Sequence, residues 1–552
     1  MNDILRSHPR APRPLAAVFL VLALSLGLAA APALPGSPAG AAQAQTTEAL
    51  LDTVQRAGVL YFWTEANPAN GMVRDRNTPG AVSSIASTGF GLSALCIGVD
   101  HGWLPRAAVR TRVLTTLNTF WTGPQGNAVN GMIGYKGLFY HWLDMNTARR
   151  TWNAELSTID TALLMAGILD AKQYFTGNDP EEMQIRALAD SIWRRCDWNW
   201  TRNNTGAIKM GWLPGAATEA AGFNTFGQWI GYNEAMILYI MAIGSPTHPI
   251  GGGLWGTWLG GYQWQTHYGY SYVIFPPLFG HQYSHCWIDF RGIADGYMRA
   301  RGITYFENSR RATLAQRAYA IDNPNNWVAY SDSLWGFTAS DDPAGYKAHG
   351  APPPWDENGT ITPTAGLSSL PFAPEVVVPL LHNLWNNWRG TLWGPYGFTD
   401  AFNPTVGWVG ADVLGIDQGP IVLMIENHRN EGVWQRMSRD GDLARGLTLA
   451  GFQGRTTGVE PGPAPGATLS ARAEPNPFQA SATVRYHLPA AGHVRVELVD
   501  VRGRVVARLV DGERPAGEHA VAVAGADLVP GVYHVRVSTD GASAITRLVR
   551  VR

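Results

Sequence analysis

Four acidic residues stand where an apolar, helix-like run of the chain begins. Glu155 and Asp160 flank the start of the run in NAELSTIDTALLMAG, Glu234 opens the run in GQWIGYNEAMILY, and Asp417 precedes the run in GIDQGPIVLMIEN. Cleavage of a glycosidic bond needs two carboxyl groups, a protonated one at the leaving oxygen and a carboxylate that activates water or attacks the sugar. Glu234, Asp160, Glu155 and Asp417 are therefore the predicted catalytic residues.

Each of these acids also has a purely structural interpretation. Ser157 and Asp160 have the spacing of a capping box, and Asp417 has the position of an N-cap. Glu155 could be a first-turn acid that the helix dipole favours. Glu234 is harder to explain in this way, because it leads straight into AMILYIMAI, where a lone acid gains little unless it faces a polar cavity.

Aromatic residues surround several of the acids. All 22 tryptophans lie between Trp63 and Trp434, and sugars stack their C–H faces on such rings. The segments FYHWLDMNT and YSDSLWGFTASD place acids among aromatics, as the wall of a sugar-binding site would, although turn-forming acids give the same pattern. The predicted substrate-binding residues are Tyr140, His141, Trp142, Asp144, Tyr232, His281, His285, Trp287, Arg291 and Trp335.

The sequence predicts no cofactor and no metal. His281 and His285 are four residues apart, which suits half of a metal site, but a third ligand is not evident. Nucleotide-binding, phosphate-binding and serine-nucleophile motifs do not occur in a convincing context. The 42 Lys and Arg residues nearly cancel the 43 Asp and Glu residues, so the charge does not favour a nucleic acid, and a neutral glycan is the expected partner.

The acids depend on helices for their placement. Helical apolar spacing predicts ten helices before residue 453: Thr47–Glu65, Ser83–Val99, Arg106–Phe120, Ser157–Phe175, Glu181–Trp193, Gly227–Ile243, Trp287–Ala300, Tyr305–Ile321, Pro371–Trp388 and Gly410–Asn427. Such a series suits a mainly α fold, an (α/α)6 toroid. In a toroid the inner helices are parallel, so their N-termini, with the four acids, should meet at one end. Residues 251–283, rich in Gly and aromatics, are predicted to form a long functional loop.

The C-terminal part has a different texture. Residues 454–468 are rich in Gly, Pro and Thr, as in a linker. Short β-branched runs such as ATVRYHL, HVRVELVD and GVYHVRVS follow, separated by turn residues. They predict a small antiparallel β-sandwich of six or seven strands over residues 469–552, after a helical domain over residues 45–453.

The first 44 residues have the pattern of a secretory signal peptide. Three arginines precede an apolar run, and Ala42-Gln43-Ala44 offers a cleavage site, although an uncleaved membrane anchor would have a similar run. No later stretch is long and apolar enough to span a membrane. We therefore expect a secreted, periplasmic or cell-surface protein. Cys96, Cys196 and Cys286 lie far apart, which predicts buried, inert thiols.

Several long motifs occur in the order typical of one family. TGFGLSALCIGVDHGWLPR, GLFYHWLDMNTARRTWNAELSTIDTALLMAG, GQWIGYNEAMILYIMAIGSPTHP, FGHQYSHCWIDFRGIADGY and GIDQGPIVLMIENHRN resemble the bacterial glucoamylase-like family, which includes the bacterial endo-β-1,2-glucanases. The resemblance implies an (α/α)6 toroid and metal-independent hydrolysis of β-1,2-glucan. It implies a general acid at Glu234, an acidic pair at Asp160 and Glu155, and a further acid at Asp417, and it leaves the base open.

The C-terminal residues resemble another kind of module. Pro475-Asn476-Pro477-Phe478, Asp500-Val501-Arg502-Gly503 and Leu528-Val529-Pro530-Gly531 are similar to the Ig-like modules that follow many exported bacterial enzymes. Such modules imply attachment to a cell surface or a secretion system, and a passive spacer is the alternative. For the whole chain, endo-acting hydrolysis of β-1,2-glucan leads. Exo-acting hydrolysis on the same fold and non-catalytic glycan binding remain as alternatives.

Overall fold

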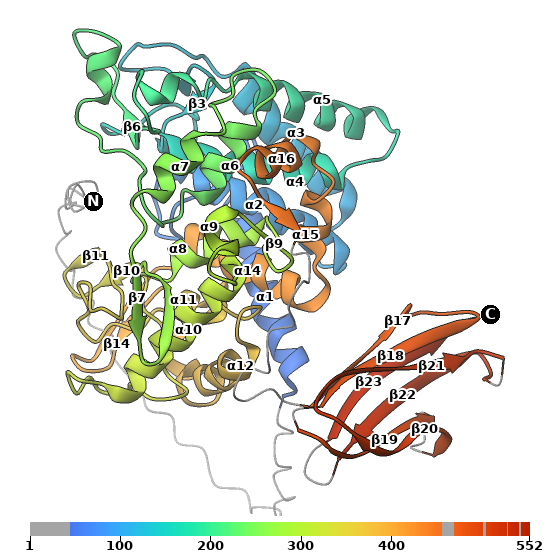
Figure 1. Ribbon diagram of the computed structural model, residues 1–552. Coiled ribbons are helices and arrows are strands. Elements are labelled where there is room, and N and C mark those ends of the chain that lie inside the picture. The colour runs from blue at the N-terminus through green and yellow to red at the C-terminus, as the bar shows by residue number, and fades with distance from the viewer. Residues whose placement is uncertain are drawn as a thin grey trace, which may run out of the picture. The chain divides into compact units, whose positions relative to one another are not determined.

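The computed structural model describes residues 45–454, 469–488, 490–500, 504–526, 528–539 and 543–551. The chain divides into two compact units, Met1–Arg455 and Thr456–Arg552. The first unit is mainly helical and the second consists of strands (Figure 1). The predicted signal peptide over residues 1–44 and residues 455–468 of the predicted linker lie outside the described residues.

Six helical segments of the first unit form an inner ring. Helix α2 packs against α4 and α14, α4 packs against α6, and α6 packs against η3. Nε2 of Gln282 in α8 donates to the carbonyl of Ala365 in α11 at 2.7 Å, and α11 packs against α14, which closes the ring. The ring comprises α2 (Ile85–Asp100), α4 (Thr158–Tyr174), α6 (Met236–Gly244), α8 (Phe279–Gln282) with η3 (Tyr283–Cys286), α11 (Pro363–Leu367) and α14 (Gly415–Asn430).

Six further helices surround this ring. Helix α1 packs on α2 and α14, α3 on α2 and α5, α5 on α4, α16 on α6, α10 on α8 and α12 on α11. In Figure 1, α2 and α14 lie in the middle of the unit, and α5 and α12 lie at opposite edges. The outer helices are α1 (Thr47–Thr64), α3 (Arg106–Thr122), α5 (Pro180–Arg195), α10 (Tyr305–Asp322), α12 (Pro374–Asn383) and α16 (Gly441–Leu449). Two concentric helical layers confirm the predicted fold class.

The burial of the two layers differs as their sequences predict. Almost every residue of α2 and α6 is buried, whereas α5 buries one face, with Ile185, Ala189 and Ile192 among its buried residues. An inner helix is apolar on all sides because it contacts protein on all sides, and an outer helix is amphipathic. Among the described residues, no helix is long and apolar enough to cross a membrane.

Glycines allow two inner helices to approach closely. A Cβ atom on Gly167 of α4 would lie 1.9 Å from the carbonyl oxygen of Gly89 in α2, and a Cβ on Gly89 would lie 2.4 Å from the carbonyl oxygen of Leu163. Both distances are far inside van der Waals contact. The backbones of α2 and α4 therefore meet at a separation that only glycine permits.

Two of the ten predicted helices need correction. The segment 287–300 is mostly irregular, because the Asp289 carboxylate accepts a hydrogen bond from the Arg291 N–H and Asp295 caps the short α9 (Gly296–Arg299). The predicted helix 227–243 begins only at Met236. Before it, Asn233 Oδ1 accepts from the Ala235 N–H at 2.9 Å, and this side-chain bond replaces a helical one. The predicted long loop 251–283 is partly ordered as α7, a hairpin and α8.

Very short two-stranded antiparallel sheets lie at the N-terminal ends of the inner helices. Strand β1 (Ser83–Ser84) pairs with β4 (Trp142–Leu143) and leads straight into α2. In the same way β5 (Leu156–Ser157) pairs with β6 (Gly211–Trp212) and leads into α4. A third two-stranded sheet is a hairpin of β10 (Ala339–Asp342) and β11 (Gly345–Ala348).

The other elements of this unit are short. They are β2 (Gly134–Tyr135), β3 (Leu138–Phe139), η1 (Trp200–Arg202), η2 (Ala220–Phe223), α7 (Leu254–Leu259), β7 (Trp264–His267), β8 (Tyr270–Val273), β9 (Ile293–Ala294), η4 (Leu384–Trp388), α13 (Arg389–Leu392), β12 (Trp393–Gly394), β13 (Gly397–Phe398), β14 (Phe402–Asn403), β15 (Trp408–Val409), α15 (Gly432–Met437) and β16 (Gln453–Gly454).

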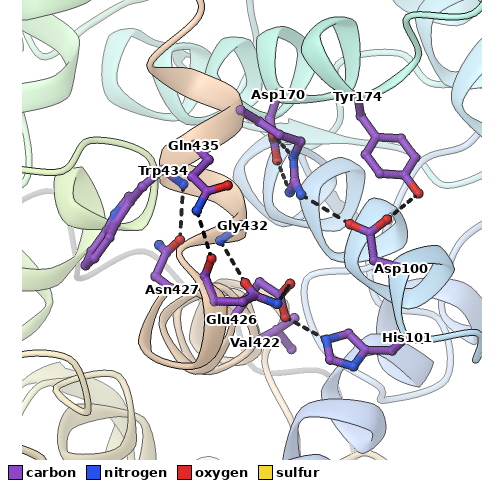
Figure 2. Close-up of polar contacts among 12 residues, drawn as sticks. Asp100, His101, Asp170, Tyr174, Val422, Glu426, Asn427, Gly432, Trp434 and Gln435 are labelled. Carbon is purple, nitrogen blue, oxygen red and sulfur yellow. Dashed lines mark hydrogen bonds and ion pairs between the residues drawn. The ribbon is translucent and has the colours of Figure 1, made fainter. Parts of the chain in front are cut away.

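A polar network ties together the C-terminal ends of α2, α4 and α14 (Figure 2). Arg436 of α15 donates to both carboxylate oxygens of Asp170, at 2.6 and 3.1 Å, and lies 3.5 Å from Asp100. Glu426 accepts from Nε2 of Gln55 at 2.9 Å and lies 2.8 Å from the ring of His101. This network, the far-end clamp, fixes the end of the ring opposite the helix starts.

In its described residues, the second unit has seven strands in two antiparallel sheets, ordered β17-β18-β21 and β20-β19-β22-β23. Their inward-facing residues, such as Val484, Val496 and Val535, form one core. This arrangement confirms the predicted small β-sandwich. The strands are β17 (Ser470–Glu474), β18 (Ser481–Leu488), β19 (Gly492–Asp500), β20 (Val505–Arg514), β21 (Gly517–Ala524), β22 (Gly531–Ser538) and β23 (Ser543–Arg550).

The three cysteines are buried and form no disulfide, as predicted. Cys96 lies on α2 and Cys286 ends η3, both in the inner ring, whereas Cys196 follows the outer helix α5. Burial raises the pKa of each thiol, which keeps it protonated and unreactive.

Candidate active site

A cavity of about 250 Å³ lies at the N-terminal ends of the inner helices. Ser84 and Ser157, the N-caps of α2 and α4, line it together with Leu414, which precedes α14. Glu234, two residues before α6, and Tyr283, the first residue of η3, complete the contribution of the helix starts. The starts of five inner segments therefore meet at one pocket, as predicted, whereas no residue of α11 lines it.

Glu234 is a half-buried acid on the wall of this cavity. The carboxyl group has one oxygen, Oε2, that is buried and has no hydrogen-bond partner among the described residues. Burial raises the pKa of Glu234 to about 7, and the negative charge of Asp160 adds to this rise. The group is therefore largely protonated at slightly acidic pH, which suits a general acid.

Asp160 and Glu155 lie on the same cavity and share one histidine. Nδ1 of His141 lies 2.8 Å from Oε1 of Glu155, and Nε2 of the same ring lies 3.7 Å from Oδ1 of Asp160. Burial opposes the charged imidazole, but the two carboxylates outweigh it and raise the pKa of His141 to about 9. Burial likewise opposes the charged form of Glu155, yet His141 lowers the pKa of this carboxyl group. The three residues form a carboxylate–imidazolium–carboxylate group.

Asp160 takes part in the helix cap and also lies on the cavity wall. The hydroxyl of Ser157 accepts from the Asp160 N–H at 3.2 Å, as a helix cap does, and donates to Oδ2 of Asp160 at 2.5 Å. Asp160 also lines the cavity. The hydrogen bonds with Ser157 fix the orientation of the Asp160 carboxyl group on the cavity wall.

Asp417 does not line the cavity, which corrects its predicted position. It is buried in the first turn of α14, where it forms a pair with the buried Asp400. Burial and neighbouring carboxylates raise the pKa of both groups, to about 7 for Asp400. The pair therefore retains a proton near neutral pH. A direct contact of Asp417 with a ligand in this cavity is not supported by its position.

Sequence reasoning missed the charged wall next to this pair. Asp75 and Arg76 line the cavity, and the Arg76 guanidinium lies 3.1 Å from both Asp341 and Asp412. Arg76 forms an isolated β-bridge with Leu414, which brings the segment beside α14. The only signal in the sequence is the charged pair in VRDRN, which is also what a surface turn would have.

Two of the ten predicted substrate-binding residues line the cavity. They are His141 and Trp142, whose rings stack with centroids 3.8 Å apart. The sequence did not indicate the other aromatic side chains of the wall, although Trp229 lies in the same motif as Glu234, because only the folded chain shows which of the many aromatic residues line the cavity. These residues are Phe226, Trp229, Phe279, Tyr283 and Tyr346.

The other eight predicted binding residues do not line this cavity. Tyr140, Tyr232, Trp287 and Trp335 are buried in the two cores of the helical unit. The carboxylate of Asp144 accepts from the N–H groups of Asn146 and Thr147 and fixes a turn.

The remaining three of these eight residues are two histidines and one arginine. His281 is buried against Tyr232, with ring centroids 4.7 Å apart, and burial lowers its pKa to about 3. His285 is buried beside Ser309. Arg291 forms ion pairs with Asp289 and Glu431 on the surface. Their residue types were compatible with sugar binding, but core packing and surface ion pairs explain them.

In the part of the chain that the structure describes, no group of three or more His, Cys, Asp or Glu residues could hold a metal ion. The residues on the cavity instead combine one carboxyl group, Glu234, whose pKa is raised to about 7, with another, Glu155, whose pKa His141 lowers. One group can donate a proton and another can activate water, which is the pairing that acid–base hydrolysis of a glycosidic bond needs.

Comparison with known proteins assigns the chain to a family. Residues 227–440 match the Glycoamylase family model. A solved glucoamylase-family structure from Bacteroides uniformis is 32% identical, with a TM-score of 0.68, and the match covers 74% of this chain and 98% of that one. The chain belongs to the Glycoamylase family.

Two further relatives of this chain have names that state an activity. The endo-beta-1,2-glucanase of Chitinophaga pinensis, solved with sophorotriose and glucose, is 29% identical with a TM-score of 0.68, over 74% of this chain and 99% of that one. An exo beta-1,2-glucooligosaccharide sophorohydrolase of Parabacteroides distasonis is 30% identical over 436 residues, 73% of this chain. The match spans 58% of the length of that relative.

Proposed function

We propose that this protein is a glycoside hydrolase that cleaves β-1,2-glucan within the chain. The observation that carries the proposal is the cavity in which Glu234, with its pKa raised to about 7, faces the carboxylates of Asp160 and Glu155. Membership of the Glycoamylase family and the likeness to the Chitinophaga pinensis endo-beta-1,2-glucanase support the choice of substrate and of endo action.

In the proposed mechanism, Glu234 donates its proton to the glycosidic oxygen as the bond breaks. Asp160 or Glu155 accepts a proton from the attacking water, and His141 lies between the two side chains and lowers the pKa of Glu155. A separation of roughly 6.5–9.5 Å between acid and base leaves room for water and inverts the anomeric centre, whereas roughly 5 Å predicts retention. Proton NMR of the first product formed distinguishes the two outcomes.

Exo action is the second candidate, because the Parabacteroides distasonis relative is an exo-acting sophorohydrolase. The sizes of early products separate the two activities. Endo action gives a mixture of oligosaccharides from the first minutes, and exo action gives one small product throughout. Linear β-1,2-glucan is the substrate, with other glucans in parallel and the Glu234→Gln variant as the control for contaminating activity.

Different results would remove different parts of the proposal. Products from another glucan but none from β-1,2-glucan would contradict the substrate and leave the enzyme class intact. Binding of glucan without any hydrolysis would favour the third alternative, a glycan-binding protein. Full activity in Glu234→Gln would show that the acid has been placed wrongly.

We further propose that the protein is exported and that its C-terminal sandwich contacts the cell surface or a secretion system. The charged and apolar pattern of residues 1–44 supports export, and the resemblance of residues 474–552 to exported Ig-like modules supports attachment. N-terminal sequencing of the mature protein should begin after Ala44. Cell fractionation with and without residues 456–552 should show whether the sandwich retains the protein at the surface.

A further inference from the structure

The loop from Asp144 to Glu155 is held by hydrogen bonds and leads from the cavity to the protein surface. Asp144 fixes its turn, and on the return the Thr151 N–H donates to the Trp142 carbonyl at 3.2 Å. The His141 N–H donates to the carbonyl of Glu155 at 2.9 Å. These hydrogen bonds therefore fix the backbone of Glu155 and of the residues just before it.

Trp152, three residues before Glu155, is the most exposed tryptophan of the described residues, at 54% of its surface. Its backbone has a φ of 52°, in the left-handed region that a bulky residue seldom adopts. The exposed indole contributes little to a core. A large apolar ring held outward by an unfavourable backbone conformation indicates a binding role.

The ring of Trp152 continues the wall of the cavity. Its centroid lies 6.0 Å from that of Trp142, at an interplanar angle of 62°. Trp142 lines the cavity and stacks on His141. Two indole rings thus extend from His141 at the cavity towards solvent.

We propose that Trp142 and Trp152 form an outer sugar-binding platform, which holds glucosyl units of the chain beyond those inside the cavity. The proposal rests on the proposed function, since its ligand is the same neutral glucan. Flat, apolar rings suit the C–H faces of uncharged sugars. Because Trp152 lies outside the cavity, it should affect long oligosaccharides and not the shortest ones.

The experiment measures affinity and turnover separately. Calorimetry with β-1,2-glucooligosaccharides of increasing length is carried out on Glu234→Gln, alone and combined with Trp152→Asn. Asparagine tolerates the left-handed backbone that position 152 requires. We expect Trp152→Asn to weaken binding of long oligosaccharides by roughly three- to tenfold and to leave the shortest ones unchanged. Trp152→Phe should restore most of the loss.

Trp121→Ala provides the matched control. Trp121 is 39% exposed, ends the outer helix α3 and lies beneath the Arg195 guanidinium, 4.8 Å away. It should leave binding unchanged at every length. In the otherwise unmodified enzyme, Trp152→Asn should raise KM for long substrates while kcat and its pH profile on the shortest substrate stay constant, which a displaced Glu155 would not allow.

Two negative results have different meanings. If Glu234→Gln binds β-1,2-glucooligosaccharides and Trp152→Asn changes affinity equally at all lengths or not at all, the platform is wrong and the proposed function stands. If Glu234→Gln binds none of them at any length, the proposed function is wrong and the platform is wrong with it.

Discussion

At the scale of single residues, Glu234 has two features that are unfavourable for the stability of the fold. It lies in an apolar run and its buried oxygen has no partner among the described residues. The sequence alone predicted this residue, because no capping or turn role explains an acid in front of AMILYIMAI. Asp400 and Arg76 could not be predicted, because only the folded chain brings them beside α14 and the cavity.

Glu234→Gln should be inactive and yet more stable at alkaline pH. A carboxyl group whose pKa is raised in the folded state, from 4.5 to about 7, lowers the free energy of unfolding as pH rises through this interval. Above pH 7 the penalty is complete, and removing it should stabilise the variant by up to about 3 kcal/mol. Urea unfolding at pH 8 and at pH 4 checks this. Equal stability differences at both pH values, or no difference from the exposed control Glu48→Gln, would contradict it.

His141→Gln should change the pH profile of the reaction. The imidazolium lowers the pKa of Glu155, so its loss should move the acidic limb of kcat/KM to higher pH. The pKa of His141 itself is raised to about 9, so its ion pairs stabilise the fold fully below about pH 6.5 and lose this contribution as pH rises through 9. A pH series of kcat/KM and of Tm tests both effects. The exposed His248→Gln should change neither, and an unmoved acidic limb in His141→Gln would refute this role.

At the scale of helices and strands, long amphipathic helices were predictable and short inner ones were not. The apolar spacing of the outer helices α1, α3 and α10 predicted their bounds within two residues. Segments α8, η3 and α11 have five residues or fewer and are buried on all sides, so they show no amphipathic period. The fold class was nonetheless predictable, because the motif order and the longer helices sufficed.

Gly167→Ala should destabilise the helical unit although alanine favours helices. The new Cβ would lie 1.9 Å from the carbonyl oxygen of Gly89, and two packed backbones must separate to relieve this contact. A loss of about 1–3 kcal/mol is expected, as for other overpacked cores. Gly256→Ala in α7 is the control, because a Cβ there would have no atom within 4 Å. Thermal unfolding should give a lower Tm for the first variant only, and the same Tm for both would disprove close packing of α2 against α4.

At the scale of the whole molecule, the helical unit separates catalytic and structural charges. The helix starts carry the acids of the cavity, whereas the far-end clamp joins the C-terminal ends of three inner helices through Arg436 and Glu426. Glu426 has its pKa lowered by its hydrogen bonds with His101 and others, although burial opposes this. Among the described residues, no hydrogen bond or ion pair of the clamp reaches the cavity wall, so its loss should affect stability and leave chemistry unchanged.

Arg436→Met should test this separation. It leaves the fully buried Asp170 without its charged partner, which should cost about 3–5 kcal/mol. Arg436→Met combined with Asp170→Leu should recover part of the loss, because both buried charges are then gone. Chemical denaturation measures the stability, and kcat of the folded fraction should match the parent. A tenfold lower kcat at a temperature where the variant is fully folded would show that the clamp also shapes the site.

The three buried cysteines can report local opening of the helical unit. A thiol reagent added to the native protein should modify none of them. Each should react only when the residues packed around it separate. Labelling at Cys96 and Cys286 would report separation of the central helices, and labelling at Cys196 would report loosening at the periphery. Mass spectrometry of partly labelled chains could therefore reveal whether the two layers come apart together or one after the other.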